Sequence, residues 1–210
     1  SEVPYHMIEI TIERESATMV TNNRQADYEI DPIYLERWSP RGFSEKEVDE
    51  ETLFSLFEAA RWAPSAGNLQ PWRFIIARTK EDREKFYQFI ADANVEWCRK
   101  APVLVAIVSK KIRNEKGAPN ATHAFDTGAA WGVLALEAVR KGLITHGMGG
   151  IDREKAKEVL NIPKEFDVQA IIAIGYFDPD AELSEDNRKR EVPSNRQPVK
   201  EFVYEGSFKE

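Results

Sequence analysis

Apolar residues gather in three short runs along this chain, at residues 72–77, 103–108 and 168–174. All three runs are rich in β-branched or aromatic residues and are typical of strands. The second run, Val103-Leu104-Val105-Ala106-Ile107-Val108, is apolar almost throughout. Such a run is typical of a strand that is covered on both faces. The pattern therefore predicts a sheet with at least one fully buried strand.

The best-defined helix is predicted to begin after Asp49 and to end before Pro64. Asp49 is a good N-cap residue, and Val48 and Leu53 are spaced to form a hydrophobic staple. Proline disfavours helical geometry at the residue before it, here Ala63, so the helix should stop there. Helical spacing gives this helix a buried stripe of Leu53, Leu56, Phe57 and Ala60.

Further helices are predicted at residues 33–38, 81–91, 95–100, 121–141 and 152–160. The helix at 121–141 is apolar on nearly every side, as in a core or at a subunit interface, and Gly142 ends it. Residues 8–13 alternate with a period of two, which predicts a strand or an arm on a partner subunit. Residues 110–120 predict a charged surface loop, and the chain beyond residue 179 predicts irregular structure. Because helices alternate with strands, the fold class is α/β or α+β.

The chain is interpreted as a single domain at residues 31–210, preceded by an extension or arm at residues 1–30. Its 210 residues can bury a sizeable core. The net charge of −7, with acidic and basic residues interspersed, disfavours nucleic acid as a partner. The longest apolar runs are too short to span a membrane, and no basic and apolar leader opens the chain, so export is not expected.

Cys98 is the only cysteine, which excludes an intramolecular disulfide and a cysteine-rich metal site. Its apolar neighbours favour a packed structural thiol over a reactive one. No group of His, Asp and Glu has the spacing of a metal site, so no metal is expected. These features together predict a protein of the reducing cytoplasm.

Two segments carry the candidate chemistry. Residues 37–41, Arg-Trp-Ser-Pro-Arg, place two guanidinium groups and a hydroxyl together, which suits a phosphate. Residues 59–72 run from the end of a predicted helix into a short polar loop. This loop offers side-chain amides and backbone N–H groups but no nucleophile. A phosphate clamp and an amide-lined loop suit a nucleotide-like cofactor that itself carries the reactive chemistry. The chain has neither a glycine-rich dinucleotide fingerprint nor a phosphate loop, so such a cofactor would bind in another way.

In this order, the segments resemble the FMN-dependent nitroreductase family, from about residue 32 to the C-terminus. The similar pieces are residues 37–43, 59–72, 126–142 with 148–150, and 194–198. The resemblance implies an α+β, nitroreductase-like fold in which helices flank a central, mostly antiparallel sheet. It also implies an entwined homodimer with two FMN molecules at the subunit interface.

For the phosphate of FMN, the resemblance implies Arg37, Arg41 and Arg196 as ligands, with a hydroxyl from Ser39. Forked guanidinium donors match phosphate oxygens and make strong, charge-assisted bonds. Surface ion pairing is the alternative for all three arginines. Trp38 stands where the family commonly has a second arginine, so a backbone contact remains but a side-chain contact to phosphate is lost.

For the flavin ring, the resemblance implies a strip made by Pro64, Ser65 and Ala66, with a backbone N–H directed at flavin N5. The amides of Asn68 and Gln70 would bond the pyrimidine or ribityl end. An ordinary turn is the alternative, because these residue types are also common in turns.

Met148, Gly149 and Gly150 would approach the far face of the flavin, unless they form only a tight turn. His123 either faces the substrate pocket or is a solvated residue at the start of its helix, and His146 is equally open. Arg61 is interpreted as structural, because a cation is favourable near the end of a helix.

The resemblance implies a ping-pong oxidoreductase. NADH or NADPH would give a hydride to FMN, and an electron-poor acceptor such as a nitroaromatic, quinone or enone would then take it. Flavin N5 carries the chemistry, so no catalytic side chain is expected. The alternatives are a non-catalytic flavin-binding or sensing protein, a dehalogenating or flavin-fragmenting relative, and an interaction protein without a cofactor.

Overall fold

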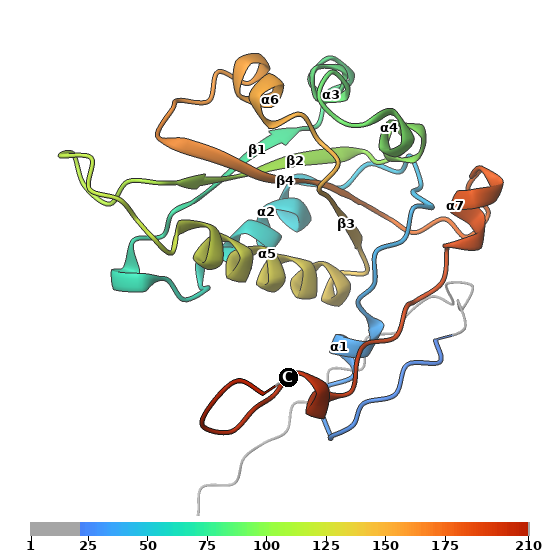
Figure 1. Ribbon diagram of the computed structural model, residues 1–210. Helices are drawn as coiled ribbons and strands as arrows, with labels where there is room; N and C mark the ends of the chain where they lie inside the picture. The colour runs from blue at the N-terminus through green and yellow to red at the C-terminus, as the bar shows by residue number, and fades with distance from the viewer. Residues whose placement is uncertain (1–21, 210) are drawn as a thin grey trace, which may run out of the picture.

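A four-stranded antiparallel sheet forms the centre of the computed structural model, which describes residues 22–209. Its strands are β1 (Trp72–Ala77), β2 (Val103–Lys110), β3 (Ile144–Met148) and β4 (Phe166–Gly175), in the order β1-β2-β4-β3. Helices cover both faces of the sheet, so the predicted α+β class and helix-flanked antiparallel sheet are confirmed (Figure 1).

The helices divide between the two faces of the sheet. In Figure 1, α3, α4 and α6 lie above the sheet, whereas α2 and α5 lie below it. The helices are α1 (Ile33–Glu36), α2 (Glu50–Arg61), α3 (Lys80–Tyr87), α4 (Asp92–Cys98), α5 (His123–Arg140), α6 (Arg153–Val159) and α7 (Glu185–Lys189). Two short 3-10 turns, Ala66–Asn68 and Val199–Glu201, complete the described elements.

The start of α2 follows its sequence signals. The Asp49 carboxylate accepts a hydrogen bond from the Thr52 N–H at 2.8 Å, which caps the helix as predicted. Three residues of the predicted stripe, Leu53, Leu56 and Ala60, are fully buried, and Phe57 is half-buried. This stripe lies in the layer between α2, α5 and the sheet.

Helix α5 has one buried face and one exposed face. Ala130, Leu134 and Ala138 are buried against α2 and the sheet. On its other side Phe125 is 81% exposed, and Gly128 and Gly132 are also exposed. One face of α5 is therefore in the core, and the other is an uncovered surface of apolar and small residues.

Strand β3 was not predicted from the sequence, which indicated only a possible tight turn at residues 148–150. Tertiary context decides this segment, because β3 pairs with β4 over its whole length, from Ile144 opposite Gly175 to Met148 opposite Ile171. Gly147 packs closely on Trp131, since a Cβ atom there would lie 3.3 Å from Cζ2 of that side chain. Helix α7 also departs from expectation, because irregular structure was predicted beyond residue 179.

The chain before α1 lies against the C-terminal part of the chain. In Figure 1, the blue segment that begins at residue 22 lies beside the red segment that follows α7. The side chain of Asp27 accepts a hydrogen bond from the N–H of Val199 at 2.8 Å. The strand or arm expected at residues 8–13 lies outside the described residues. The division into an extension at 1–30 and a domain at 31–210 stays a prediction.

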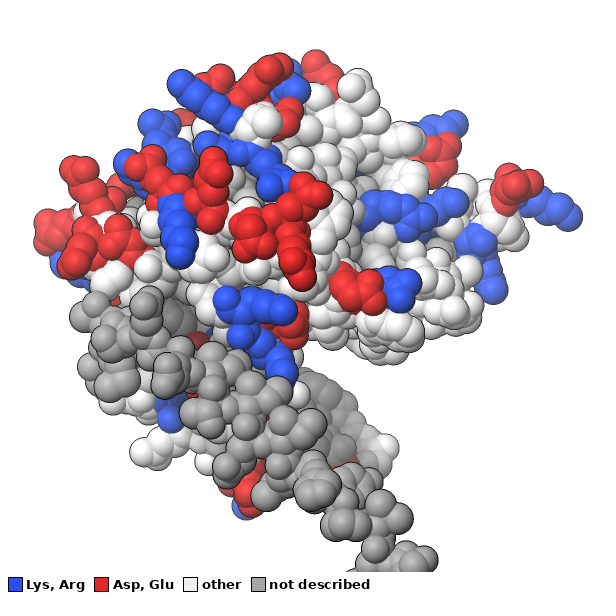
Figure 2. Space-filling view, turned by 180° about the vertical axis from the view of Figure 1, so that it is seen from behind, with Lys and Arg blue, Asp and Glu red and all other residues white. Residues whose placement is uncertain are grey.

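Charges are mixed over the surface. Figure 2 shows acidic and basic side chains intermingled on one face of the molecule. Between residues 22 and 209, no helix is long and apolar enough to cross a membrane.

Candidate functional site

Five arginines surround one cavity of about 240 Å³ beside strand β3. Arg37 and Arg41 come from the segment after α1, Arg190 and Arg196 from the segment after α7, and Arg24 from the segment before α1. Trp38, Ser39, His146, Val192 and Ser194 complete the lining. No carboxylate lines this cavity among the described residues, so its chemistry suits an anion with several oxygen atoms.

The segment that carries Arg37 and Arg41 is fixed by a buried carboxylate. Glu191 is 8% exposed, and its oxygens accept hydrogen bonds from the N–H groups of Arg41, at 2.8 and 2.9 Å, and Gly42, at 2.7 Å. A Cβ atom at Gly42 would lie 2.5 Å from the carbonyl oxygen of Asp178, so glycine is required there. Glu191 therefore sets the backbone from which the Arg41 side chain leaves.

The arginines repel one another in this cavity. Burial lowers the pKa of Arg37, and the charges of Arg24 and Arg196 lower it further. Burial and Arg190 likewise lower the pKa of Arg41, while Glu191 opposes them. Such a gathering of cations is costly unless an anion neutralises it, which indicates a binding site rather than a structural network.

The guanidinium groups of Arg37 and Arg41 are the least engaged of the five. Arg37 Nη1 donates one long hydrogen bond, of 3.3 Å, to Ser39 Oγ. The Arg41 side chain makes no hydrogen bond to any described residue, whereas Arg196 and Arg190 bond to neighbouring backbone oxygens. Arg37 and Arg41 are therefore the arginines most available to a ligand.

His146 forms part of the cavity wall and is held in one tautomer. Its Nδ1 lies 3.0 Å from the carbonyl oxygen of Pro40, which only accepts, so Nδ1 carries the proton. The ring packs on Trp97, with 4.4 Å between the ring centroids. Burial lowers the pKa of His146 to about 4, and Arg41 and Arg37 add to this effect, while the bond to Pro40 opposes it. His146 is thus neutral at pH 7.

This burial predicts a loss of stability in mild acid. Below a pKa of about 6.5, the unfolded chain binds a proton at His146 that the folded chain, with a pKa of about 4, does not bind. Stability is therefore lost as the pH falls from about 6.5 to 4, and the loss at pH 5 is about 2 kcal/mol.

Urea unfolding at pH 7.5 and pH 5 measures this loss. His146→Gln should show a smaller difference in the free energy of unfolding between the two pH values than the wild type does. Equal differences in the wild type and His146→Gln would contradict the assignment.

The polar loop at residues 64–70 is an exposed strip with a strained backbone. Gly67, Asn68 and Gln70 have positive φ values of 55°, 55° and 48°. Left-handed geometry is unfavourable for residues other than glycine and is often found at functional sites. The loop is closed by Ser65 Oγ, which accepts a hydrogen bond from the Gln70 N–H at 3.0 Å.

Buried Asp126 anchors this loop to the first turn of α5. Its Oδ2 accepts hydrogen bonds from the Ala66 N–H at 3.1 Å and from the Thr122 hydroxyl at 2.9 Å. The Ala66 N–H is therefore already hydrogen-bonded within the chain, so it is not free to make the bond to flavin N5 that was expected from residues 64–66. The Gln70 amide donates to the Asn68 carbonyl oxygen, at 2.9 Å.

The arginine cavity and the loop lie at opposite edges of the sheet. The loop leads into β1, which is one edge strand, and the cavity adjoins β3, which is the other. Three interstrand spacings separate these edges, roughly 14 Å. The structure thus brings together five predicted site residues around the cavity, Arg37, Trp38, Ser39, Arg41 and Arg196. A separate group on the loop consists of Pro64, Ser65, Ala66, Asn68 and Gln70.

The remaining predicted site residues lie at the end of β3: Met148 is its last residue, and Gly149 and Gly150 follow it. The Met148 side chain is buried in the core, so only its backbone is open to a ligand. Gly149 and Gly150 are exposed, and the Gly150 carbonyl accepts a hydrogen bond from the Ala91 N–H at 3.0 Å. Sequence reasoning missed Arg24, Arg190 and Glu191, which stand in weakly patterned or charged stretches with no local signal of their role.

His123 is half-buried at the start of α5 and is hydrogen-bonded within the protein. Its Nδ1 lies 2.7 Å from the hydroxyl of buried Ser109, which also accepts a hydrogen bond from Gln169 at 2.8 Å.

Cys98 is buried as predicted, and burial raises the pKa of its thiol to about 12, which makes it unreactive. No group of three or more metal-ligating side chains occurs among residues 22–209.

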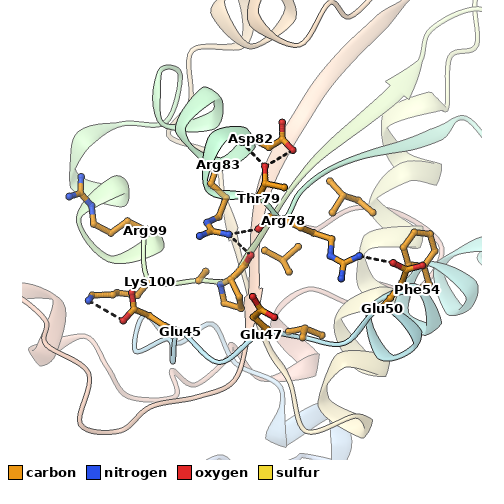
Figure 3. Close-up of a pocket in the computed structure, with 15 residues that line it drawn as sticks. Glu45, Glu47, Glu50, Phe54, Arg78, Thr79, Asp82, Arg83, Arg99 and Lys100 are labelled. Atoms are coloured by element: carbon orange, nitrogen blue, oxygen red, sulfur yellow. Dashed lines mark hydrogen bonds and ion pairs between the residues drawn. The ribbon is translucent and has the colours of Figure 1, made fainter.

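A larger cavity, of about 690 Å³, shares no residue with the arginine cavity (Figure 3). Two of its four cations pair with carboxylates, since Arg78 lies 3.0 Å from Glu50 and Lys100 lies 3.7 Å from Glu45. The charges in this cavity balance, so it does not rival the arginine cavity as an anion site.

A model described as "Nitroreductase family" matches residues 34–96 and 90–176. These residues include Arg37 and Arg41, the loop at 64–70 and the four strands, but not Arg24, Arg190 or Arg196. The chain belongs to the nitroreductase family.

Individual relatives agree with this assignment. A crystal structure of an oxidoreductase containing FMN is 42% identical, covers 91% of this chain and 98% of its own, and superposes with a TM-score of 0.85. A "Putative NADH dehydrogenase/NAD(P)H nitroreductase" of Archaeoglobus fulgidus is 29% identical over 69% of this chain and 82% of its own. An iodotyrosine deiodinase bound to FMN and 3-iodo-L-tyrosine shares the fold, with 24% identity, a TM-score of 0.61, and coverage of 84% of this chain and 98% of its own.

Proposed function

We propose that this protein is an FMN-dependent oxidoreductase that passes a hydride from NADH or NADPH to an electron-poor acceptor. The observation that carries the proposal is the cavity in which five arginines and no carboxylate meet among the described residues. The FMN content of a relative that is 42% identical supports the same cofactor.

The cavity fits the phosphate of FMN better than the whole cofactor. Its volume of about 240 Å³ is below the roughly 300–1,000 Å³ typical of pockets that enclose a small-molecule ligand. Arg37 and Arg41 would bind the phosphate oxygens, Ser39 would donate its hydroxyl, and neutral His146 would line the wall. The ring would therefore lie outside this cavity.

A second copy of the chain is the proposed source of the ring contacts. Within one chain, the 64–70 loop lies at the far edge of the sheet from the arginines. Next to the loop, Trp62 is 74% exposed and Phe125 is 81% exposed, so apolar surface remains to be covered. A homodimer would bring the loop of one subunit to the arginine cavity of its partner.

Mixing two defective subunits tests this shared site. Arg37→Ala/Arg41→Ala removes the clamp, and Ala66→Trp, at an exposed position, blocks the loop. Neither homodimer should bind FMN. After subunit exchange, one site in each heterodimer is intact, so FMN binding should return to about a quarter of the wild-type level. If both contacts came from one subunit, no binding would return.

Bound FMN would supply the hydride chemistry, and the protein would hold and orient it. The clamp fixes the charged tail, and the loop offers small exposed side chains on which a flat ring can lie. The acceptor would then be a nitroaromatic, quinone or enone, reduced in a ping-pong cycle. The cytoplasm is the proposed location.

Mixing the yellow protein with NADH or NADPH under anaerobic conditions tests the enzymatic proposal. Rapid bleaching at about 450 nm, followed by recovery of colour with an added quinone, is expected for a protein whose flavin reacts with both substrates. A yellow protein that neither donor bleaches would instead be a flavin-binding or sensing protein. A colourless protein that FMN does not stabilise would be an interaction protein.

A further inference from the structure

Arg24 lies before residue 34, where the match to the family begins, yet its side chain lines the arginine cavity. One guanidinium group here bonds three backbone carbonyls. Nε donates to the carbonyl of Ser194 at 2.8 Å, and Nη1 donates to the carbonyls of Arg37, at 2.6 Å, and Leu35, at 3.1 Å. Arg24 therefore ties the segment that carries Arg37 to the segment that carries Arg196.

The neighbours of Arg24 strengthen the same connection. The Asn22 side chain donates to the carbonyl of Leu35 at 2.9 Å, and its oxygen accepts from the N–H of Arg24 at 3.2 Å. Asp27 bonds the Val199 N–H at 2.8 Å, beyond Arg196. The segment before α1 is thus hydrogen-bonded both to the segment that carries Arg37 and to the segment that carries Arg196.

Electrostatics makes an arginine at this position costly in the absence of a ligand. Burial and the charge of Arg196 both lower the pKa of Arg24, and Arg24 in turn lowers the pKa of Arg37. Arg24 Nη2 makes no hydrogen bond to any described residue, so its two N–H groups remain available to an anion.

We propose that Arg24 is a positioning residue of the phosphate site, which holds Arg37 and Arg196 around a phosphate monoester and adds a further positive charge beside it. This inference rests on the proposed function, since FMN is the phosphate monoester concerned. It assigns to the segment before the family domain a part in cofactor binding.

Comparing FMN with riboflavin tests the inference, because the two differ only in the phosphate. Arg24→Ala should weaken FMN binding roughly 10- to 100-fold, the range of charge-assisted hydrogen bonds, and leave riboflavin binding unchanged. Arg24→Lys keeps the charge but lacks the fork that spans three carbonyls, so its FMN affinity should be intermediate. Arg78→Ala, which loses only a surface ion pair with Glu50, is the matched control and should bind like the wild type.

A second readout needs no flavin. Inorganic phosphate should raise the melting temperature of the wild-type apoprotein. It should raise the melting temperature of Arg24→Ala by a smaller amount. If Arg24→Ala left the ratio of FMN to riboflavin affinity unchanged, whether both affinities stayed the same or fell equally, the inference would be overturned. Wild-type protein that binds neither FMN nor phosphate would instead overturn the proposed function.

Discussion

Replacing both Arg37 and Arg41 by alanine is expected to reduce FMN affinity by roughly 10²- to 10⁴-fold, since charge-assisted hydrogen bonds contribute about 1.5–3 kcal/mol each. The fold should survive, because these guanidinium groups do little within the protein. Arg37 makes only one long bond, to Ser39, and Arg41 makes none to a described residue. The melting temperature of the apoprotein should stay the same or rise, as repulsion in the cavity is relieved.

Fluorescence titration of the apoprotein with FMN measures this loss. The double variant Arg78→Ala/Arg153→Ala is the matched control, because it removes the same charge outside the cavity. Arg78 pairs with Glu50, and Arg153 bonds the carbonyl of Gln169. An FMN affinity equal to that of the control would show that the phosphate binds elsewhere.

Replacing Glu191 by alanine is expected to have the largest effect on stability among the residues of the site. The N–H groups of Arg41 and Gly42 would lose their acceptor in a buried place. Leaving a buried donor without a partner costs about 1–3 kcal/mol, so the free energy of unfolding should fall by roughly 2–6 kcal/mol. FMN affinity should fall as well, because the backbone that directs the Arg41 side chain is released.

Urea unfolding of the apoprotein checks the effect of Glu191. Glu191→Gln keeps one acceptor oxygen and should be less destabilised than the alanine variant. Glu185→Ala removes an exposed carboxylate that pairs with Lys189 and lies outside the cavity, and this variant should unfold like the wild type. An unfolding midpoint that Glu191→Ala does not change would contradict the anchoring role.

Local signals predicted the elements whose stability is local. The Asp49 cap, the stripe of α2 and the strand at residues 72–77 were predicted within one or two residues, because capping and periodicity act over a few positions. Strand β3 escaped prediction, because Thr145, His146 and Gly147 have no strand pattern and gain their geometry from β4.

The candidate site was predicted in part for a similar reason. Residues 37–41 show their arginines side by side, so a phosphate clamp was visible in the sequence. Glu191 lies 150 positions from Arg41, in a charged stretch that resembles a solvated surface, and only the fold brings it to the backbone of the clamp. Arg24 escaped notice because its partners are backbone carbonyls, which leave no trace in the sequence.

The central claim is that the arginine cavity binds the phosphate of FMN, and a crystal structure of the FMN-loaded protein tests it most directly. We expect phosphate oxygens within hydrogen-bond distance of the guanidinium groups of Arg37 and Arg41 of one subunit. The ring should lie on residues 64–70 of the other. A phosphate outside the arginine cavity would contradict the account.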